Sequence, residues 1–211
     1  MTGTKADFLA ERCAAADISF LRIDYRGHGQ SSGTFTDGTI GAWFEDTCTV
    51  FDRLTEGAQI VVGSSMGGWL ACLLAVGRAA RVHALIGVAA GPDFTEDLVL
   101  PHLTEPQKER LEKDGVIYFK APPPAQPMPI TKRLLVEAKA HLVLDKPLSI
   151  LCPVRLLQGM EDEDIPWQHA LRVAAAIGQG DVQVTLVKDG GHRLSRPQDL
   201  ALLWRTVEEF V

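Results

Sequence analysis

A serine between glycines is the first feature of the sequence whose residue types could do chemistry. Residues 63–67 read G-S-S-M-G, which fits the pattern G-x-S-x-G, and they follow a short apolar run. A strand that turns at once into a helix brings its backbone close to itself, so side chains at both glycine positions are expected to clash. Ser65 then stands at the apex of the turn, and we predict that it is a nucleophile. A glycine-rich turn with incidental serines is the alternative.

A serine hydroxyl is a weak nucleophile that needs a general base, and the base needs an orienting carboxylate. His192 follows two glycines in the segment K-D-G-G-H-R, and we predict that it is the base rather than a solvated loop histidine. The segment E-D-E-D at 161–164 offers the carboxylate. We choose Asp162, with Asp164 as the alternative. Asp93, after an earlier apolar run, is less favoured and could instead cap a helix.

Short apolar strands alternate with helices along most of the chain. Strands are predicted at 18–25, 59–64, 83–90, 154–158 and 182–187, and helices at 3–16, 39–55, 66–78, 166–177 and 197–210. This alternation predicts an α/β fold of three layers, in which a mostly parallel sheet has helices on both faces. The carboxyl ends of parallel strands meet at one edge of the sheet, so Ser65, Asp162 and His192 are expected to lie together.

The composition changes between residues 92 and 148. Charged helical pieces are predicted at 94–100, 104–114 and 131–142, around a proline-rich stretch at 121–129. Proline at this density is incompatible with a sheet interior or a long helix. We therefore predict a small insertion over the carboxyl edge of the sheet, a lid within one domain of residues 1–211. A surface connection without function is the alternative.

The overall composition limits the partners. The chain is 46% apolar and 23% charged, and its net charge of −6 argues against nucleic acid and against an anionic membrane surface. The sequence shows no membrane-spanning run and no secretory signal. It also shows no metal-ligand spacing and no phosphate loop, so neither a metal nor a cofactor is expected. The four cysteines are far apart and are expected to be buried free thiols in a reducing compartment. Together these features predict a cytoplasmic protein, and they leave its oligomeric state open.

These motifs resemble the α/β-hydrolase-fold serine hydrolases. The resemblance is carried by D-Y-R-G-H-G-Q-S at 24–31, G-S-S-M-G-G at 63–68, Q-G-M-E-D-E-D-I-P-W at 158–167 and G-G-H-R at 190–193. More narrowly, V-G-S-S-M-G-G-W-L, A-L-I-G-V-A and C-P-V-R-L-L-Q-G-M-E-D are similar to the mitochondrial palmitoyl-protein thioesterase type of α/β-hydrolase-domain protein and its bacterial relatives. The resemblance implies that Ser65 is the nucleophile, Asp162 the acid and His192 the base. It implies that the N–H of Met66 is one oxyanion donor.

The sequence departs from this family at its start. The family's sheet has three strands before the helix predicted at 3–16. The third of them lies between the strands that correspond to 18–25 and 59–64, and the loop after it supplies the second oxyanion donor. We therefore expect Met1 to be an internal methionine of an N-terminally truncated chain. Either 18–25 and 59–64 keep unpaired edges, or they close up and pair directly. Losing one oxyanion donor typically costs about 10²–10³ in turnover.

The function predicted from the sequence is hydrolysis of carboxylic esters or thioesters through a Ser-His-Asp triad and an acyl-enzyme. The substrate is expected to be a small molecule or an acylated partner, with apolar lid side chains such as Ile117 and Met128 forming an acyl pocket. An amidase, a peptidase or an acyltransferase on the same scaffold is one alternative. A catalytically inactive binding domain on a truncated hydrolase fold is the other.

Overall fold

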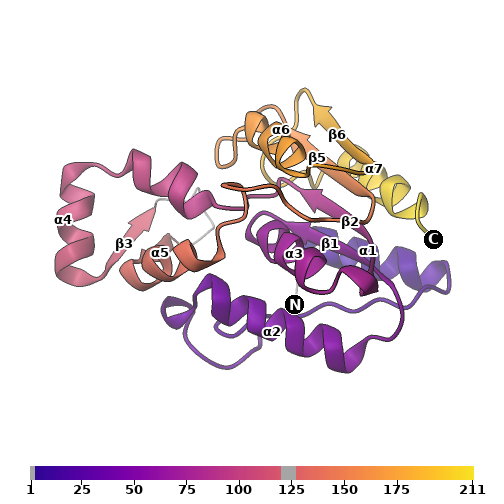
Figure 1. Cartoon of the computed structure of the whole chain (residues 1–211), viewed down its shortest axis with the longest axis horizontal. Coiled ribbons are helices and arrows are strands. Elements are labelled where there is room, and N and C mark those ends of the chain that lie inside the picture. The colour runs from indigo at the N-terminus through magenta and orange to yellow at the C-terminus, as the bar shows by residue number, and fades with distance from the viewer. Residues whose placement is uncertain (1–2, 120–126) are drawn as a thin grey trace.

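Four parallel strands form the central sheet of the protein. The computed structural model describes residues 3–119 and 127–211 (Figure 1). The strands are β1 (Gln59–Ser64), β2 (Val82–Val88), β5 (Val154–Gly159) and β6 (Val182–Val187), arranged in the order β1-β2-β5-β6. The register aligns Ser64 of β1 with Val88 of β2, and Val88 in turn with Leu157 of β5. The carboxyl ends of the strands therefore lie at one edge of the sheet, as predicted.

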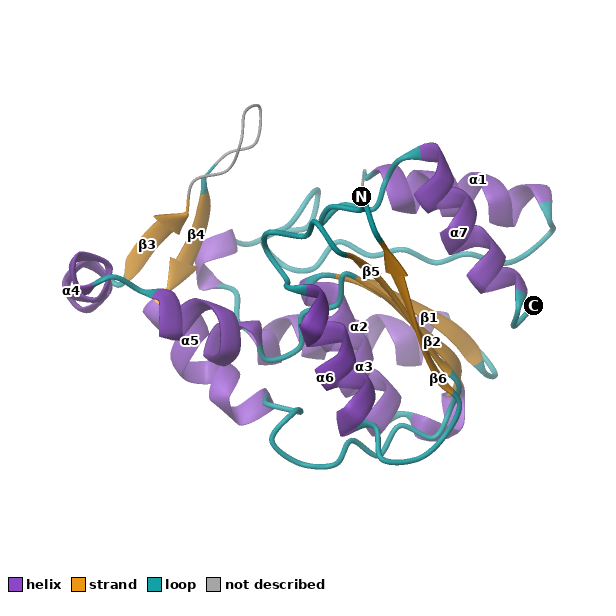
Figure 2. Cartoon of the chain, turned by 90° about the horizontal axis from the view of Figure 1, so that it is seen from above, coloured by secondary structure: helices purple, strands orange, loops and turns teal. Residues whose placement is uncertain are grey.

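Helices cover both faces of this sheet and give the predicted three-layer fold (Figure 2). They are α1 (Thr4–Ala15) and α7 (Pro197–Glu208) on one face, with α2 (Ile40–Leu54), α3 (Met66–Gly77) and α6 (Trp167–Ala176) on the other. Ile86 and Val88 of β2 point into the cluster under α1 and α7, whereas Leu85 points into the larger cluster on the opposite face. Both faces of the sheet at β2 are therefore apolar, which explains why this strand reads as a nearly continuous apolar run.

The prediction of a strand at residues 18–25 is wrong. These residues form no strand, and β1 ends the sheet on this side, paired only with β2. Two outcomes were expected: the edges of 18–25 and 59–64 stay unpaired, or the two segments pair directly. In the described part of the chain they do not pair with each other. The residues have the apolar, β-branched character of a strand, but a strand also needs a neighbour for its backbone groups. That neighbour is missing in the described part of the chain.

The excursion between β2 and β5 contains more regular structure than the sequence predicts. It comprises a π-helical turn (Thr95–Val99), α4 (Glu105–Asp114), β3 (Val116–Phe119), β4 (Met128–Thr131) and α5 (Lys132–Ala138). The antiparallel pair β3–β4 was not predicted, because Pro129 argues against a strand. Pro129 pairs with Tyr118 in a sheet of only two strands, where each strand has a free edge that tolerates proline. Most of the proline-rich stretch, at 120–126, lies outside the described residues.

All four cysteines are free, as predicted; Cys13 and Cys72 are buried, whereas Cys48 and Cys152 are only partly so. Among residues 3–119 and 127–211, every helix is too short or too polar to span a bilayer.

A buried carboxylate closes the neck of the excursion. Asp93 follows β2 and is 1% exposed. Its oxygens accept hydrogen bonds from the N–H of Val143, at 2.9 and 3.0 Å, and from the N–H of Leu144, at 2.7 Å. Burial raises the pKa of Asp93 above its usual value, although the two N–H groups act in the opposite direction. Asp93 thereby ties the start of the excursion to its end.

We predict that Asp93→Ala lowers the free energy of unfolding by about 2–5 kcal/mol, because two buried N–H groups lose their acceptor. Asp93→Asn is expected to cost less, because its amide oxygen can still accept a hydrogen bond and asparagine tolerates the positive φ of 58° at this position. Urea titrations measure both values. The control is Asp145→Ala, which removes an exposed carboxylate near the same neck. An equal, small effect of Ala at 93 and at 145 would contradict the role assigned to Asp93.

Candidate active site

A strained turn presents Ser65 at the end of β1. Its φ of 54° and ψ of −124° lie outside the usual regions for a residue with a side chain, and α3 begins at the next residue. A Cβ at Gly63 would collide with the carbonyl group of Gly67, and a Cβ at Gly68 would collide with Ala90. Gly67 itself has room, since the nearest atom to its Cβ position is 3.7 Å away. The expected clash is therefore present at the first motif glycine and absent at the second.

The turn places the start of α3 beside the serine. Ser65 donates its N–H to the carbonyl of Val88 on β2, at 3.0 Å, which fixes the turn to the sheet. Met66 is the first residue of α3. The N–H groups of a first helical turn have no partners within the helix, and the helix dipole makes this end positive. The Met66 N–H can therefore stabilise negative charge that develops next to Ser65.

His192 and Asp162 complete a hydrogen-bonded chain with this serine. His192 Nε2 lies 3.1 Å from Ser65 Oγ, and Nδ1 of the same ring lies 2.9 Å from Asp162 Oδ2 and 3.1 Å from Oδ1. The side chain of Asp162 is fully buried, whereas that of His192 remains 24% exposed. The structure thus brings together the three residues that the sequence singles out, from loops 97 and 30 positions apart.

Close backbone contacts hold the loops of Asp162 and His192 against each other. The N–H of Met160 bonds to the carbonyl of Val187, and the N–H of Glu161 bonds to the carbonyl of Gly190. A Cβ at Gly159 would collide with the carbonyl of Gly190, so glycine is needed at this crossing. The two loops therefore form one packed unit at the ends of β5 and β6.

The environment of Asp162 favours its ionised form. Burial opposes the charge, but hydrogen bonds from His192, from the Ile165 N–H and from Gln158 outweigh it and hold the pKa of Asp162 below its usual value. The main-chain N–H of Asp164 also donates to Asp162 Oδ1, at 2.9 Å. Asp164, the alternative acid, is exposed and contributes this N–H, with no hydrogen bond recorded between its carboxylate and His192. Asp93 is engaged at the neck of the excursion.

Gln158 is a residue of this site that the sequence analysis missed. It is fully buried, and its Nε2 donates to Asp162 Oδ2 and to the carbonyl of Ile165, both at 2.9 Å. Because two acceptors face this nitrogen, the amide must point its NH₂ group toward them. Its Oε1 is buried with no partner in the described part of the chain. A polar residue at the end of the apolar strand V-R-L-L-Q-G was the available signal.

The other histidines lie outside this hydrogen-bonded chain. His28 packs against the rings of Tyr25, Phe35 and Trp43. His169 is buried, with Nε2 2.7 Å from the carbonyl of Pro92, and burial lowers its pKa.

One group of side chains in the described residues has the composition of a metal site. Ligand atoms of Asp162, Asp164 and His192 lie within 4.8 Å of one another. Two of the three residues already bond to each other through the atoms that would bind an ion, since Nδ1 of His192 faces the carboxylate of Asp162. The arrangement therefore fits a proton relay better than a metal site.

Comparison with known families places this geometry in context. The profile described as "Alpha/beta hydrolase family" matches residues 3–201. The chain belongs to the alpha/beta hydrolase family. The predicted fold and the predicted class of enzyme, a hydrolase, are confirmed.

The similar proteins support the narrower resemblance as well. The mouse protein named "Palmitoyl-protein thioesterase ABHD10, mitochondrial" is 38% identical over 222 residues, a match that covers 100% of this chain and 71% of the mouse protein. The solved structure of mouse alpha/beta hydrolase domain-containing protein 10 has a TM-score of 0.88 and 38% identity, and covers 99% of this chain and 84% of that one. A structure from Agrobacterium vitis S4 has a TM-score of 0.96 and 38% identity, with 100% and 83% covered.

These comparisons correct one expectation. The cytoplasmic location predicted from the sequence is contradicted, because the similar proteins of mouse, cow and rat are all named as mitochondrial. Composition and free cysteines indicate a reducing compartment, but they cannot distinguish one such compartment from another.

We predict that Gln158→Leu raises the pKa of Asp162, because the ionised carboxylate loses a hydrogen bond that favours it. The carboxyl carbon of Asp162, followed by NMR during an acid titration, measures this value. Gln183→Leu, on the exposed side of β6, is the matched control and is expected to leave the pKa unchanged. An unchanged pKa of Asp162 in Gln158→Leu would show that the Gln158 amide does not stabilise the ionised carboxylate.

Proposed function

We propose that this hydrolase cleaves ester or thioester bonds through a catalytic triad of Ser65, His192 and Asp162. The observation that carries the proposal is the continuous hydrogen-bonded chain from Asp162 through His192 to Ser65, at a strained turn that exposes the serine. In this chain His192 Nδ1 donates to the carboxylate, which leaves Nε2 free to accept the proton of the serine hydroxyl.

The first half of the reaction forms an acyl-enzyme. Ser65 Oγ attacks the acyl carbon while His192 Nε2 takes the hydroxyl proton, and Asp162 stabilises the resulting imidazolium. The negative charge passes to the acyl oxygen, where the N–H of Met66 can donate to it. The tetrahedral species then collapses, and His192 gives its proton to the departing alcohol or thiol. The acyl group remains bound to Ser65 Oγ.

The second half returns the enzyme to its starting state. Water attacks the acyl carbon, His192 takes one proton from the water, and the same N–H group stabilises the oxyanion. The acid leaves when Ser65 Oγ recovers its proton from His192. One buried carboxylate serves both halves, because Asp162 keeps its charge throughout and only the imidazole changes its proton count.

Two observations support an acylated substrate. The similar mouse protein is named as a palmitoyl-protein thioesterase. In addition, Met66 beside the serine packs against the same apolar cluster as Phe94 and Leu100 of the excursion. We infer that residues 92–148 act as a lid of the single domain, and that their apolar side chains near the serine contact the acyl chain. Ile117 is buried in the core and Met128 is exposed, so neither of them lines an acyl pocket in this structure.

One observation favours the alternative of a domain with little turnover. A cavity lies next to the turn, lined by Ser64 and Gly67, on the side where the family's second oxyanion donor was expected. Loss of one oxyanion donor typically lowers turnover by a factor of about 10²–10³. Covalent labelling of Ser65 and turnover of an ester substrate therefore need to be measured separately.

We predict that a fluorophosphonate probe labels the chain at Ser65 and that Ser65→Ala abolishes both labelling and ester hydrolysis. The reason is that only a serine deprotonated by His192 attacks the phosphorus at a useful rate. The neighbouring Ser64→Ala is the matched control, and it is expected to retain labelling because no hydrogen bond joins Ser64 to His192 in the described structure. In-gel fluorescence reports the labelling. Labelling that survives in Ser65→Ala would reject the triad.

A further inference from the structure

The loop that carries His192 has little main-chain support around the imidazole. The described structure records one main-chain hydrogen bond within residues 191–195, at 3.3 Å. The ring of His192 nevertheless lies within hydrogen-bonding distance of both Asp162 and Ser65. Both contacts require a well-fixed backbone, because a misplacement of about 1 Å can slow an enzyme about a hundredfold. Contacts from outside the loop must therefore hold this part of the backbone.

The backbone just after His192 is also strained. Leu194 has a φ of 39°, in a region that residues with a side chain rarely occupy. Such a conformation persists only where the surrounding structure holds it. The side chain of Leu194 is 5% exposed and belongs to the same apolar cluster as Leu9 of α1. Helix α1 is thus one element that holds this part of the loop.

Lys5 reaches the same part of the loop from the first turn of α1. Its Nζ donates a hydrogen bond to the carbonyl of Arg193, in the peptide group that precedes Leu194. Nζ also lies 3.5 Å from Ser195 Oγ, which itself donates to the Arg193 carbonyl at 2.9 Å. Two donors thus meet at one carbonyl oxygen and fix the orientation of this peptide group. Lys5 and Leu9 lie on one face of α1, so the helix holds the loop by a polar and an apolar contact.

Another residue holds the two ends of the loop. Arg196 donates from Nη1 to the carbonyl and the carboxylate of Asp189, at 2.8 and 2.7 Å, and from Nε to Asp199 Oδ2, at 2.9 Å. None of these bonds reaches the carbonyl of Arg193. Among the described residues, Lys5 is the only side chain from outside the loop with a recorded hydrogen bond to that carbonyl. The contact made by Lys5 is therefore not duplicated.

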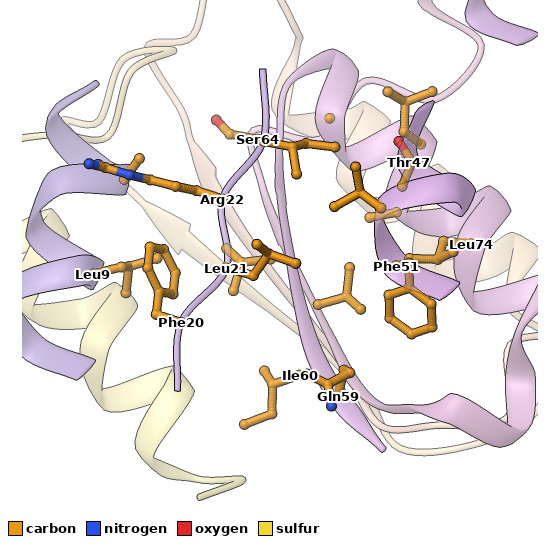
Figure 3. Close-up of a pocket in the computed structure, with 18 of the residues that line it drawn as sticks. Leu9, Phe20, Leu21, Arg22, Thr47, Phe51, Gln59, Ile60, Ser64 and Leu74 are labelled. Carbon is orange, nitrogen blue, oxygen red and sulfur yellow. The ribbon is translucent and has the colours of Figure 1, made fainter. Parts of the chain in front are cut away.

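An ion pair does not explain the position of Lys5. Lys5 and Arg22 line the cavity beside β1, and no carboxylate lines it in the described part of the chain. Figure 3 shows Arg22 with its guanidinium turned toward α1, where it pairs with Asp7. For Lys5 itself, the structure of residues 3–119 and 127–211 records hydrogen bonds to the loop and no ion pair.

The surroundings of Lys5 disfavour its charge. Burial lowers the pKa of Lys5 below its usual value, and the nearby guanidinium of Arg193 acts in the same direction, whereas Asp199 opposes both. Burying part of an ammonium group without a paired carboxylate costs stability. Sequences accept such costs mainly at functional sites. A role in the site therefore explains the place of Lys5 better than a role in the stability of the fold.

We propose that Lys5 is a positioning residue of this site: its ammonium fixes the peptide group after Arg193 and thereby keeps the ring of His192 in place. The ring then stays between Asp162 and Ser65 through both halves of the reaction. Lys5 acts through the loop and not on the reacting atoms. The proposal rests on the proposed function, because the position of this ring matters to the reaction only if His192 transfers the proton.

Three variants test this role. Lys5→Met removes the ammonium and nearly keeps the length of the side chain, whereas Lys5→Arg keeps a cation with donors. Lys188→Met is the matched control, since Lys188 is exposed just before the same loop. The rate constant for labelling of Ser65 by a fluorophosphonate is expected to fall about tenfold or more in Lys5→Met. We expect Lys5→Arg to retain most of the rate and Lys188→Met to retain all of it.

The proton on His192 Nδ1 gives a second readout, which does not need turnover. Because this nitrogen is hydrogen-bonded to Asp162, its proton is expected as a low-field signal in NMR spectra. We expect the signal to broaden in Lys5→Met, because a loosened ring exchanges its proton with water faster. The signal is expected to stay sharp in Lys188→Met and in Lys5→Arg.

Several results would overturn the proposal. They are unchanged labelling of folded Lys5→Met, slower labelling with an unchanged signal, and absence of the signal from the unsubstituted chain. If the unsubstituted chain were not labelled while the signal still depended on Lys5, the proposed hydrolysis would fail and the positioning role would stand. Circular dichroism and urea midpoints establish folding. Should Lys5→Met not fold, the shorter and uncharged Lys5→Gln is measured in its place, with the same expected results.

Discussion

The arrangement of Ser65, His192 and Asp162 depends on two places where backbone meets backbone so closely that only glycine fits. At the end of β1, Gly63 faces the carbonyl of Gly67. At the ends of β5 and β6, Gly159 faces the carbonyl of Gly190. The first contact forces the turn that strains and exposes the serine. The second joins the loops of Asp162 and His192. Without these contacts the three side chains would lie on separate loops, and nothing in the backbone would hold them within hydrogen-bonding distance.

Two buried aspartates show how the surroundings, rather than the residue type, decide what a carboxylate does. Asp162 is next to an imidazole and accepts hydrogen bonds that hold its pKa low, so it is poised to stabilise a positive charge. Asp93 is also buried, but its burial raises its pKa. Its hydrogen-bond partners are main-chain N–H groups at the neck of the excursion. One aspartate fits a role in proton transfer, and the other fastens two ends of the chain. The sequence alone favours Asp162 through its position three residues after Gly159, which ends the predicted strand, and through its place in the family motif.

Much of this could be predicted from the sequence because it is local. The apolar run at 59–64 and the largely alternating V-Q-V-T-L-V at 182–187 specify strands, and the glycines around Ser65 specify a sharp turn. The errors arose where the outcome depends on a distant partner. Residues 18–25 have a strand's composition but have no neighbouring strand in the part of the chain that the structure describes. The pair β3–β4 forms despite Pro129 because a two-stranded sheet leaves a free edge. Gln158 was missed because its importance comes from a hydrogen bond to Asp162, which no pattern of spacing reveals.

We propose that Ser65 carries the acyl group during the reaction, and trapping the acyl-enzyme is the most direct test of this role. The chain is mixed with a palmitoyl thioester of N-acetylcysteamine, quenched in acid within the first turnover, and digested for mass spectrometry. We predict a palmitoyl group on the peptide that contains Ser65, with its amount strongly reduced in His192→Ala. Thiol release that depends on the protein while Ser65 stays unmodified, or acylation confined to the cysteines, would contradict the account.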